Sequence, residues 1–196
     1  AREGPARGCS TAGDTPMPTT LTHAVVACGM GGVLTRFRRM PPLFWLLAAG
    51  LSMLPDADVV AWPLGIPRGT LWAHRGITHA FPTAALVSYV VARLAFRPLR
   101  LPFFWLWGCY FLAMSSHPFL DAFTNGGPGV AFLAPFDDTR YFFPWRPIVV
   151  SPIGLDILSR WGLRTMASEL VWVWTPTLLL VGMAWLARPR GERRPA

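Results

Sequence analysis

Four histidines and three aspartates lie within or beside the apolar stretches of this 196-residue chain. Neutral imidazole and carboxylate groups are good ligands for zinc, manganese and iron. The side chains of these types are His23, Asp56, Asp58, His74, His79, His117 and Asp121. We therefore predict that they form one metal site, provided that the fold brings them together.

The spacing of two of these pairs supports the prediction. His117 and Asp121 are four residues apart, which places both on one face of a helix. Asp56 and Asp58 follow Pro55, where the chain tends to leave a helix. Two neighbouring carboxylates repel each other unless a cation or a proton lies between them.

The segment His74-Arg75-Gly76-Ile77-Thr78-His79 opens an apolar stretch with two histidines and an arginine. On a regular helix the two histidines would diverge by about 140°. We therefore expect His74 to lie in a loop and His79 in the first helical turn, with Gly76 permitting a sharp entry. The planar guanidinium of Arg75 suits a phosphate oxygen.

Each part of this set also has a structural interpretation. His117 and Asp121 could be a hydrogen-bonded pair on a helix, and Asp56 and Asp58 could form a turn or a cap. His23 could be an interfacial histidine. These alternatives stay open for each part alone, whereas the seven side chains together favour a metal site over a structural polar cluster.

The composition indicates a membrane protein. Hydrophobic residues make up 53% of the chain and charged residues 14%, whereas an ordinary soluble domain carries about 25% charged residues. The net charge of +8 comes from arginines that cluster beside apolar runs, as membrane anchors do. We therefore expect membrane lipid as a partner and no nucleic acid. The three cysteines have no zinc or disulfide spacing.

Five apolar segments predict an all-α, polytopic membrane protein with about four to five membrane-embedded helices. They cover roughly residues 21–35, 42–55, 77–96, 102–123 and 168–187. A straight span needs about 20 apolar residues, so the first two segments are short and are expected to be tilted or to enter a polar pocket. We expect residues 1–16 to be a disordered extension, 17–190 a single helical domain, and 191–196 a basic tail.

Alternation of these segments places all seven candidate ligands at one membrane face, together with the long loops. The first, third and fifth segments end in arginine clusters at the opposite face. The positive-inside rule makes that arginine-rich face cytoplasmic. The sequence thus predicts a multi-pass protein of the inner membrane whose metal site faces outward.

Three blocks of sequence resemble the signature blocks of the YdjM-like family of membrane-bound, metal-dependent hydrolases. They are Leu54-Pro55-Asp56-Ala57-Asp58, the 74–79 segment, and Ser116-His117-Pro118-Phe119-Leu120-Asp121. The similarity covers roughly residues 17–155. The family is in turn distantly similar to zinc-dependent phospholipase C and the S1/P1 nucleases, in which a His-x3-Asp pair binds zinc. This chain has no histidine after His117, so the resemblance implies one or two zinc ions rather than three.

Together these features predict a hydrolase that acts on phosphoesters, such as lipid head groups, at the membrane surface. Asp56 or Asp58 would accept a proton from the attacking water, and Arg75 would bind a phosphate oxygen, with Arg140 and Arg146 as weaker candidates. A different class of protein is the alternative, a non-enzymatic membrane protein in which a metal ion is structural or transported.

Overall fold

The computed structural model describes residues 19–36, 38–61, 63–67, 69–151 and 158–188. Within these ranges all regular structure is helical, apart from two isolated β-bridges that join Thr124 to Ile148 and Val130 to Tyr141. The all-α class is therefore confirmed. The expectations for residues 1–16 and 191–196 lie outside the described residues.

The helical elements follow the five apolar segments closely. They are α1 (Thr20–Leu34), α2 (Pro42–Met53), the 3-10 turns η1 (Leu54–Ala61) and η2 (Ile77–His79), α3 (Phe81–Leu99), α4 (Phe103–Asp121), α5 (Arg160–Glu169), the π-helical turn η4 (Leu170–Trp174) and α6 (Thr175–Leu186). Proline occupies the first or second position of α2 and α3, where its missing N–H is not needed.

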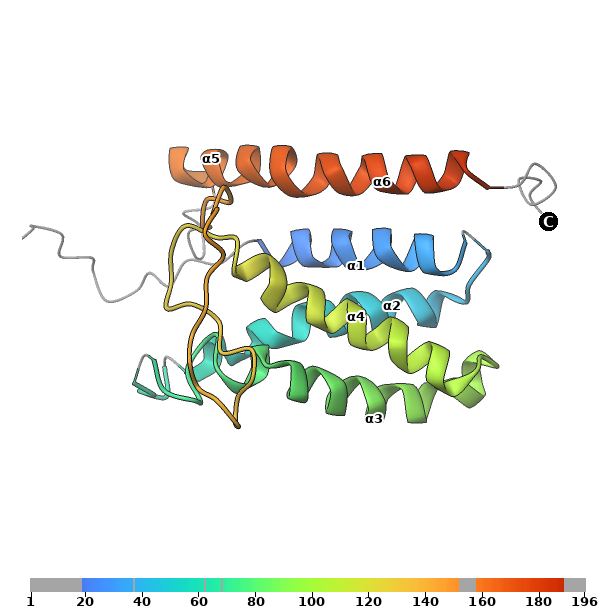
Figure 1. Cartoon of the computed structure of the whole chain (residues 1–196), viewed down its shortest axis with the longest axis horizontal. Helices are drawn as coiled ribbons and strands as arrows, with labels where there is room; N and C mark the ends of the chain where they lie inside the picture. Colours follow the sequence, from blue (N-terminus) through green and yellow to red (C-terminus); the bar gives the residue numbers. More distant parts are fainter. Residues whose placement is uncertain (1–18, 37, 62, 68, 152–157, 189–196) are drawn as a thin grey trace, which may run out of the picture.

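The helices run alternately along the long axis of the molecule, as the sequence predicted (Figure 1). Helix α4 packs against α1, α2 and α3, while α6 packs against α1. The centre of the bundle combines large residues such as Phe44 and Tyr110 with alanines such as Ala48, Ala92 and Ala113, all at most 3% exposed. Small residues at these positions let helix backbones approach closely.

Two of the described helical stretches are long and apolar enough to cross a membrane, Pro42–Ala61 and Arg160–Leu186. The second of these exposes a row of leucines, among them Leu178, Leu179 and Leu180, which is typical of a surface that contacts lipid or a partner. The finer expectation of four to five membrane-embedded helices stays a prediction.

The lengths of the segments differ from the expectation in two respects. The second segment is not short, because η1 continues α2 as far as Ala61. Helices α3 and α4 are long but less apolar than the two candidate membrane spans. Helix α3 carries Arg93 and Arg97, and α4 ends in the polar block that contains His117 and Asp121.

Candidate metal centre

Four separate elements bring the seven predicted ligands to one end of the bundle. His23 comes from the first turns of α1, and Asp56 and Asp58 from η1. The 74–79 segment enters α3, and the last turns of α4 supply the remaining pair. All seven side chains are buried. The same end carries the long loop that follows α4 (Figure 1).

The backbone between the two histidines of the 74–79 segment turns sharply at Arg75, whose φ of 63° is left-handed. Gly76 is needed for a close approach, since a Cβ there would lie 2.1 Å from the carbonyl oxygen of Leu71. As a result the rings of His74 and His79 lie with their centroids 5.1 Å apart. His79 occupies the 3-10 turn η2, just before α3 begins.

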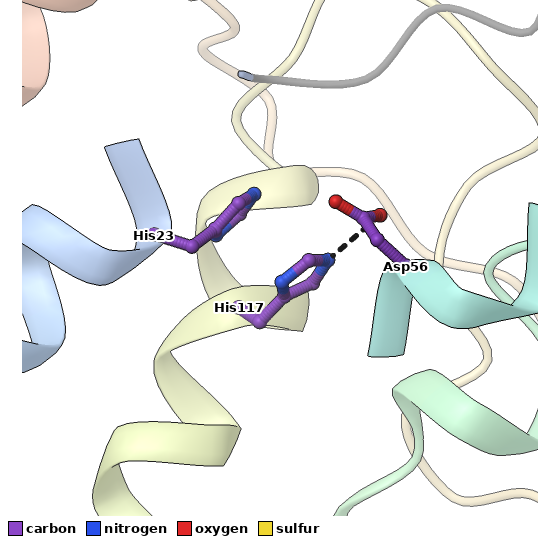
Figure 2. A group of neighbouring side chains, drawn as sticks. All are labelled: His23, Asp56 and His117. Atoms are coloured by element: carbon purple, nitrogen blue, oxygen red, sulfur yellow. Dashed lines mark ion pairs between the residues drawn. The ribbon is translucent and has the colours of Figure 1, made fainter. Parts of the chain in front are cut away.

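Five of the side chains form an inner cluster. The Nε2 atom of His117 lies 3.2 Å from Oδ1 of Asp56, and that of His79 lies 3.2 Å from Oδ2 of Asp121. The Nε2 atom of His23 lies 4.0 Å from Oδ1 of Asp121. Figure 2 shows the ring of His23 stacked beside that of His117, with centroids 3.6 Å apart, and Asp56 facing His117 across a dashed ion pair.

The atoms that face one another in this inner cluster are buried and have no hydrogen-bond partner among the described residues. They are both ring nitrogens of His23, Nε2 of His79 and of His117, Oδ1 of Asp56, and both carboxylate oxygens of Asp121. Several of them lie at ion-pair distance from one another, and Oδ2 of Asp121 also from Arg75. Buried polar atoms nearly always have hydrogen-bond partners, because the lack of one costs about 1–3 kcal/mol. A divalent cation is a partner that fits imidazole nitrogens and carboxylate oxygens together.

Three overlapping groups of side chains have ligand atoms close enough to hold an ion. Within each group these atoms lie within 4.8 Å of one another. The groups are His23, Asp56 and His117; Asp56, His74 and His79; and His79, His117 and Asp121. Because they share residues, they are parts of one site and not separate sites. The buried histidines and aspartates could therefore hold a metal ion.

Asp58 is absent from these three groups. It contacts two of the histidines on the side away from the inner cluster. Its carboxylate accepts a hydrogen bond from Nδ1 of His74 at 2.7 Å, lies 3.2 Å from Nδ1 of His79, and accepts another from the hydroxyl of Thr78. Partners of this kind orient a metal-binding histidine and fix its tautomer. This geometry favours an orienting role for Asp58, while its predicted role as a ligand stays untested.

His117 is oriented by the backbone. Its Nδ1 atom lies 2.7 Å from the carbonyl oxygen of Ser52 in α2. A proton on Nδ1 that donates to this carbonyl leaves the lone pair of Nε2 facing the inner cluster. The sequence could not indicate this contact, because any residue at position 52 would supply the same carbonyl group.

Arg75 is completely buried, and its guanidinium is occupied by protein groups. Its Nε atom lies 3.2 Å from Oδ2 of Asp121, and its terminal nitrogens donate to the Thr124 hydroxyl and the Gly126 carbonyl. Gly127 packs against it so closely that a Cβ there would lie 2.6 Å from a terminal nitrogen. Arg75 is thus placed to hold the carboxylate of Asp121. Its predicted contact with a phosphate stays untested.

The other two arginines considered as phosphate ligands also have partners within the protein. Arg140 donates to the carbonyl groups of His74 and Arg75, and to those of two further residues in adjoining loops. Partial burial lowers the pKa of Arg140 from its ordinary value, but arginine stays charged near neutral pH. The guanidinium of Arg146 lies over the ring of Phe142.

Glu169 is a buried acid beside the site that the sequence analysis missed. It is 3% exposed and accepts hydrogen bonds from the backbone N–H of Thr19 and the hydroxyl of Thr22, next to His23. The indole of Trp174, in the π-helical turn η4, donates to the same hydroxyl. This junction ties the start of α1 to the last helix. The sequence did contain a signal for Glu169, because an acid in an otherwise apolar segment commonly has a functional or structural role.

Comparison with known proteins agrees with the sequence blocks. The family model described as "YdjM inner membrane protein" matches residues 17–191. The chain is 38% identical over 173 residues to the inner membrane protein YbcI of Escherichia coli (strain K12), an alignment that covers 88% of this chain and 99% of the relative. No solved structure gives a significant match.

Proposed function

The chain belongs to the YdjM family of inner membrane proteins, and from this premise we propose that it is a membrane-bound, metal-dependent hydrolase. One observation carries the metal site. Seven atoms of five side chains, from four elements, lie buried together without hydrogen-bond partners among the described residues. Arg75 contacts only one of these atoms, Oδ2 of Asp121. Burial of the remaining histidine and aspartate atoms is costly unless a further cation lies among them.

Zinc, as one or two ions, is the metal that we propose, because zinc is commonly bound by histidine nitrogens and carboxylate oxygens. When bound, a divalent ion polarises a phosphoryl or carbonyl oxygen and makes a nearby water more acidic. His23, Asp56, His79, His117 and Asp121 would hold it, with His74 at the edge of the set. The set combines three imidazole groups with two carboxylates, whose two negative charges would balance a divalent ion.

Asp56 is the residue that we propose as proton acceptor. Within the inner cluster it is the most exposed side chain, at 7%, whereas the others are fully buried. Water and substrate would therefore approach from its side. Asp58, also 7% exposed, is occupied with His74 and would act through that histidine.

We propose phosphoesters at the membrane surface as the substrate class, on a multi-pass chain whose metal site faces outward. The distribution of arginines along the bundle supports the outward orientation of the site. The arginine-rich ends of α1 and α3 lie at the end opposite the site (Figure 1), and arginine clusters mark the cytoplasmic face.

A structural metal ion is the second candidate, and the deep burial of the inner cluster favours it. Closed sites, in which protein groups supply all ligands, are typical of structural ions. Such an ion would join α1, η1, η2 and α4 into one unit. A structural role for the ion predicts tightly bound metal and no hydrolysis.

The deciding experiment measures metal content and hydrolysis on the same detergent-purified samples. The wild-type protein should hold about one or two zinc ions per chain and cleave at least one member of a phosphoester panel. His117→Ala should lose both properties. Its control is Ser116→Ala, since among the described residues the Ser116 hydroxyl donates to the carbonyl of Ala113 in its own helix and to no group of the metal centre. Stoichiometric metal without hydrolysis would favour the structural candidate, and a wild-type protein that binds no metal would exclude both.

A further inference from the structure

A cavity of about 360 Å³ lies at the end of the bundle opposite the metal centre. It is enclosed by the connection between α1 and α2 and by the start of α4. Its lining includes Leu34, Arg36, Arg38, Leu101, Pro102 and Trp105. Sites for small molecules commonly measure about 300–1,000 Å³, so the cavity has room for part of a ligand.

Among the described residues, the charged side chains at this end are all positive. Arg36 and Arg38 are exposed, and neither forms an ion pair with a described acid. The α3 helix adds Arg93, Arg97 and Arg100 nearby. The acids that the structure describes lie in the metal centre, in the loop after α4, or at the junction of α5 with α1. An anion is therefore the ligand that this end attracts.

Part of the cavity lining is apolar. A small inorganic anion would make no favourable contact with that part. Leu34, Leu101 and Trp105 line the cavity together with residues Arg36 and Arg38. On the outer surface close by, Leu46 and Phe104 are 69% and 76% exposed, as expected of side chains that face acyl chains. A ligand with a charged head and an apolar body matches both parts of the cavity.

The backbone at Arg36 has an unusual conformation for a residue with a side chain. Its φ of 51° lies in the left-handed region, just after the end of α1. Glycine is the usual residue at such a position, because it adopts this conformation without strain. An arginine there accepts that strain, and Arg36 is one of the residues that line the cavity.

We propose that this cavity binds the headgroup of an anionic phospholipid of the phosphatidylglycerol type. Arg36 and Arg38 would contact its phosphate, and Leu101 and Trp105 would contact its glycerol and the first carbons of its acyl chains. Basic pockets between helices at the cytoplasmic side of a membrane are suited to such lipids. The proposal uses no residue of the metal centre and is independent of hydrolysis.

Native mass spectrometry of the full chain in a neutral detergent tests the proposal. Phosphatidylglycerol should bind more tightly than phosphatidylcholine with the same acyl chains. The double variant Arg36→Gln/Arg38→Gln should weaken phosphatidylglycerol binding by on the order of 25-fold, because each arginine near anionic lipid contributes about fivefold. The matched control, Arg160→Gln/Arg164→Gln, removes the same charge from exposed positions on α5 and should leave binding within about twofold.

A charge-preserving variant and a competition with free phosphate complete the test. Arg36→Lys/Arg38→Lys preserves the charge and should retain most of the binding, so it tests the site even if the glutamine variant fails to fold. Millimolar inorganic phosphate should not displace the lipid. Equal binding of the two lipids, an equal loss in the α5 control, or displacement by free phosphate would each overturn the proposal.

Discussion

The Nε atom of Arg75 lies 3.2 Å from Oδ2 of Asp121, and both side chains are completely buried. The same carboxylate oxygen lies 3.2 Å from Nε2 of His79. The carboxylate of Asp121 thus lies between the buried guanidinium of Arg75 and the other side chains of the inner cluster. A guanidinium there favours the ionised, ligating form of the carboxylate and holds it in place.

Substitution of Arg75 should therefore remove the metal. In Arg75→Ala the carboxylate of Asp121 loses its buried partner, and breaking one side of a buried ion pair costs about 3–5 kcal/mol. We expect metal content as low as in His117→Ala, measured after gel filtration, with partial retention in Arg75→Lys. An Arg75→Ala protein with full metal content and impaired turnover would instead support a direct contact of Arg75 with a phosphate.

Asp58 should affect metal affinity without being essential for it. Asp58→Asn removes the charge that orients His74 and His79, and loss of such a partner commonly lowers metal affinity about 10–100-fold. Competition with a chelator of known affinity measures this change. Complete loss of metal, as in a ligand variant, would show that Asp58 is itself a ligand.

Gly76→Ala should disrupt the entry into α3. The new methyl group would lie 2.1 Å from the Leu71 carbonyl oxygen, so the loop that positions His74 and His79 must move. We expect a loss of at least about 2 kcal/mol in the free energy of unfolding together with reduced metal binding. Gly50→Ala in α2 is the control, since a Cβ at Gly50 meets no atom within 4 Å. It should be neutral or should stabilise the helix by up to about 1 kcal/mol.

Removal of the metal should destabilise the protein. A ligand present at 1,000 times its dissociation constant contributes about 4 kcal/mol to the folded state. A chelator should therefore lower the melting temperature of the wild-type protein in detergent and have little effect on His117→Ala. An equal shift in both proteins would trace the effect to the chelator itself.

The orientation of the bundle can be tested with reporter fusions. Fusions after Arg39 and after Arg100 should report the cytoplasm, because these arginines follow the ends of α1 and α3. A fusion within the loop after α4 should report the external side. The reverse pattern would leave the metal centre intact and place its chemistry in the cytoplasm.

The sequence alone determined the helical class, the approximate positions of the five segments and the grouping of the candidate ligands at one end of the bundle. Apolar runs of this length and composition favour helices. Alternation of consecutive helices then requires groups such as His23 and the end of α4 to lie at one end. Neither conclusion depends on the details of packing.

Only the tertiary structure decided which of these residues lie inward. Asp56 and Asp58 are two positions apart on a 3-10 turn, where about three residues complete a turn, so their carboxylates point in different directions. One faces His117 and the other faces His74. The direction of Arg75 depends on its own left-handed backbone and on Gly127 from a distant loop. Contacts between elements far apart in the chain fix both results, and such contacts leave no periodic signal in the sequence.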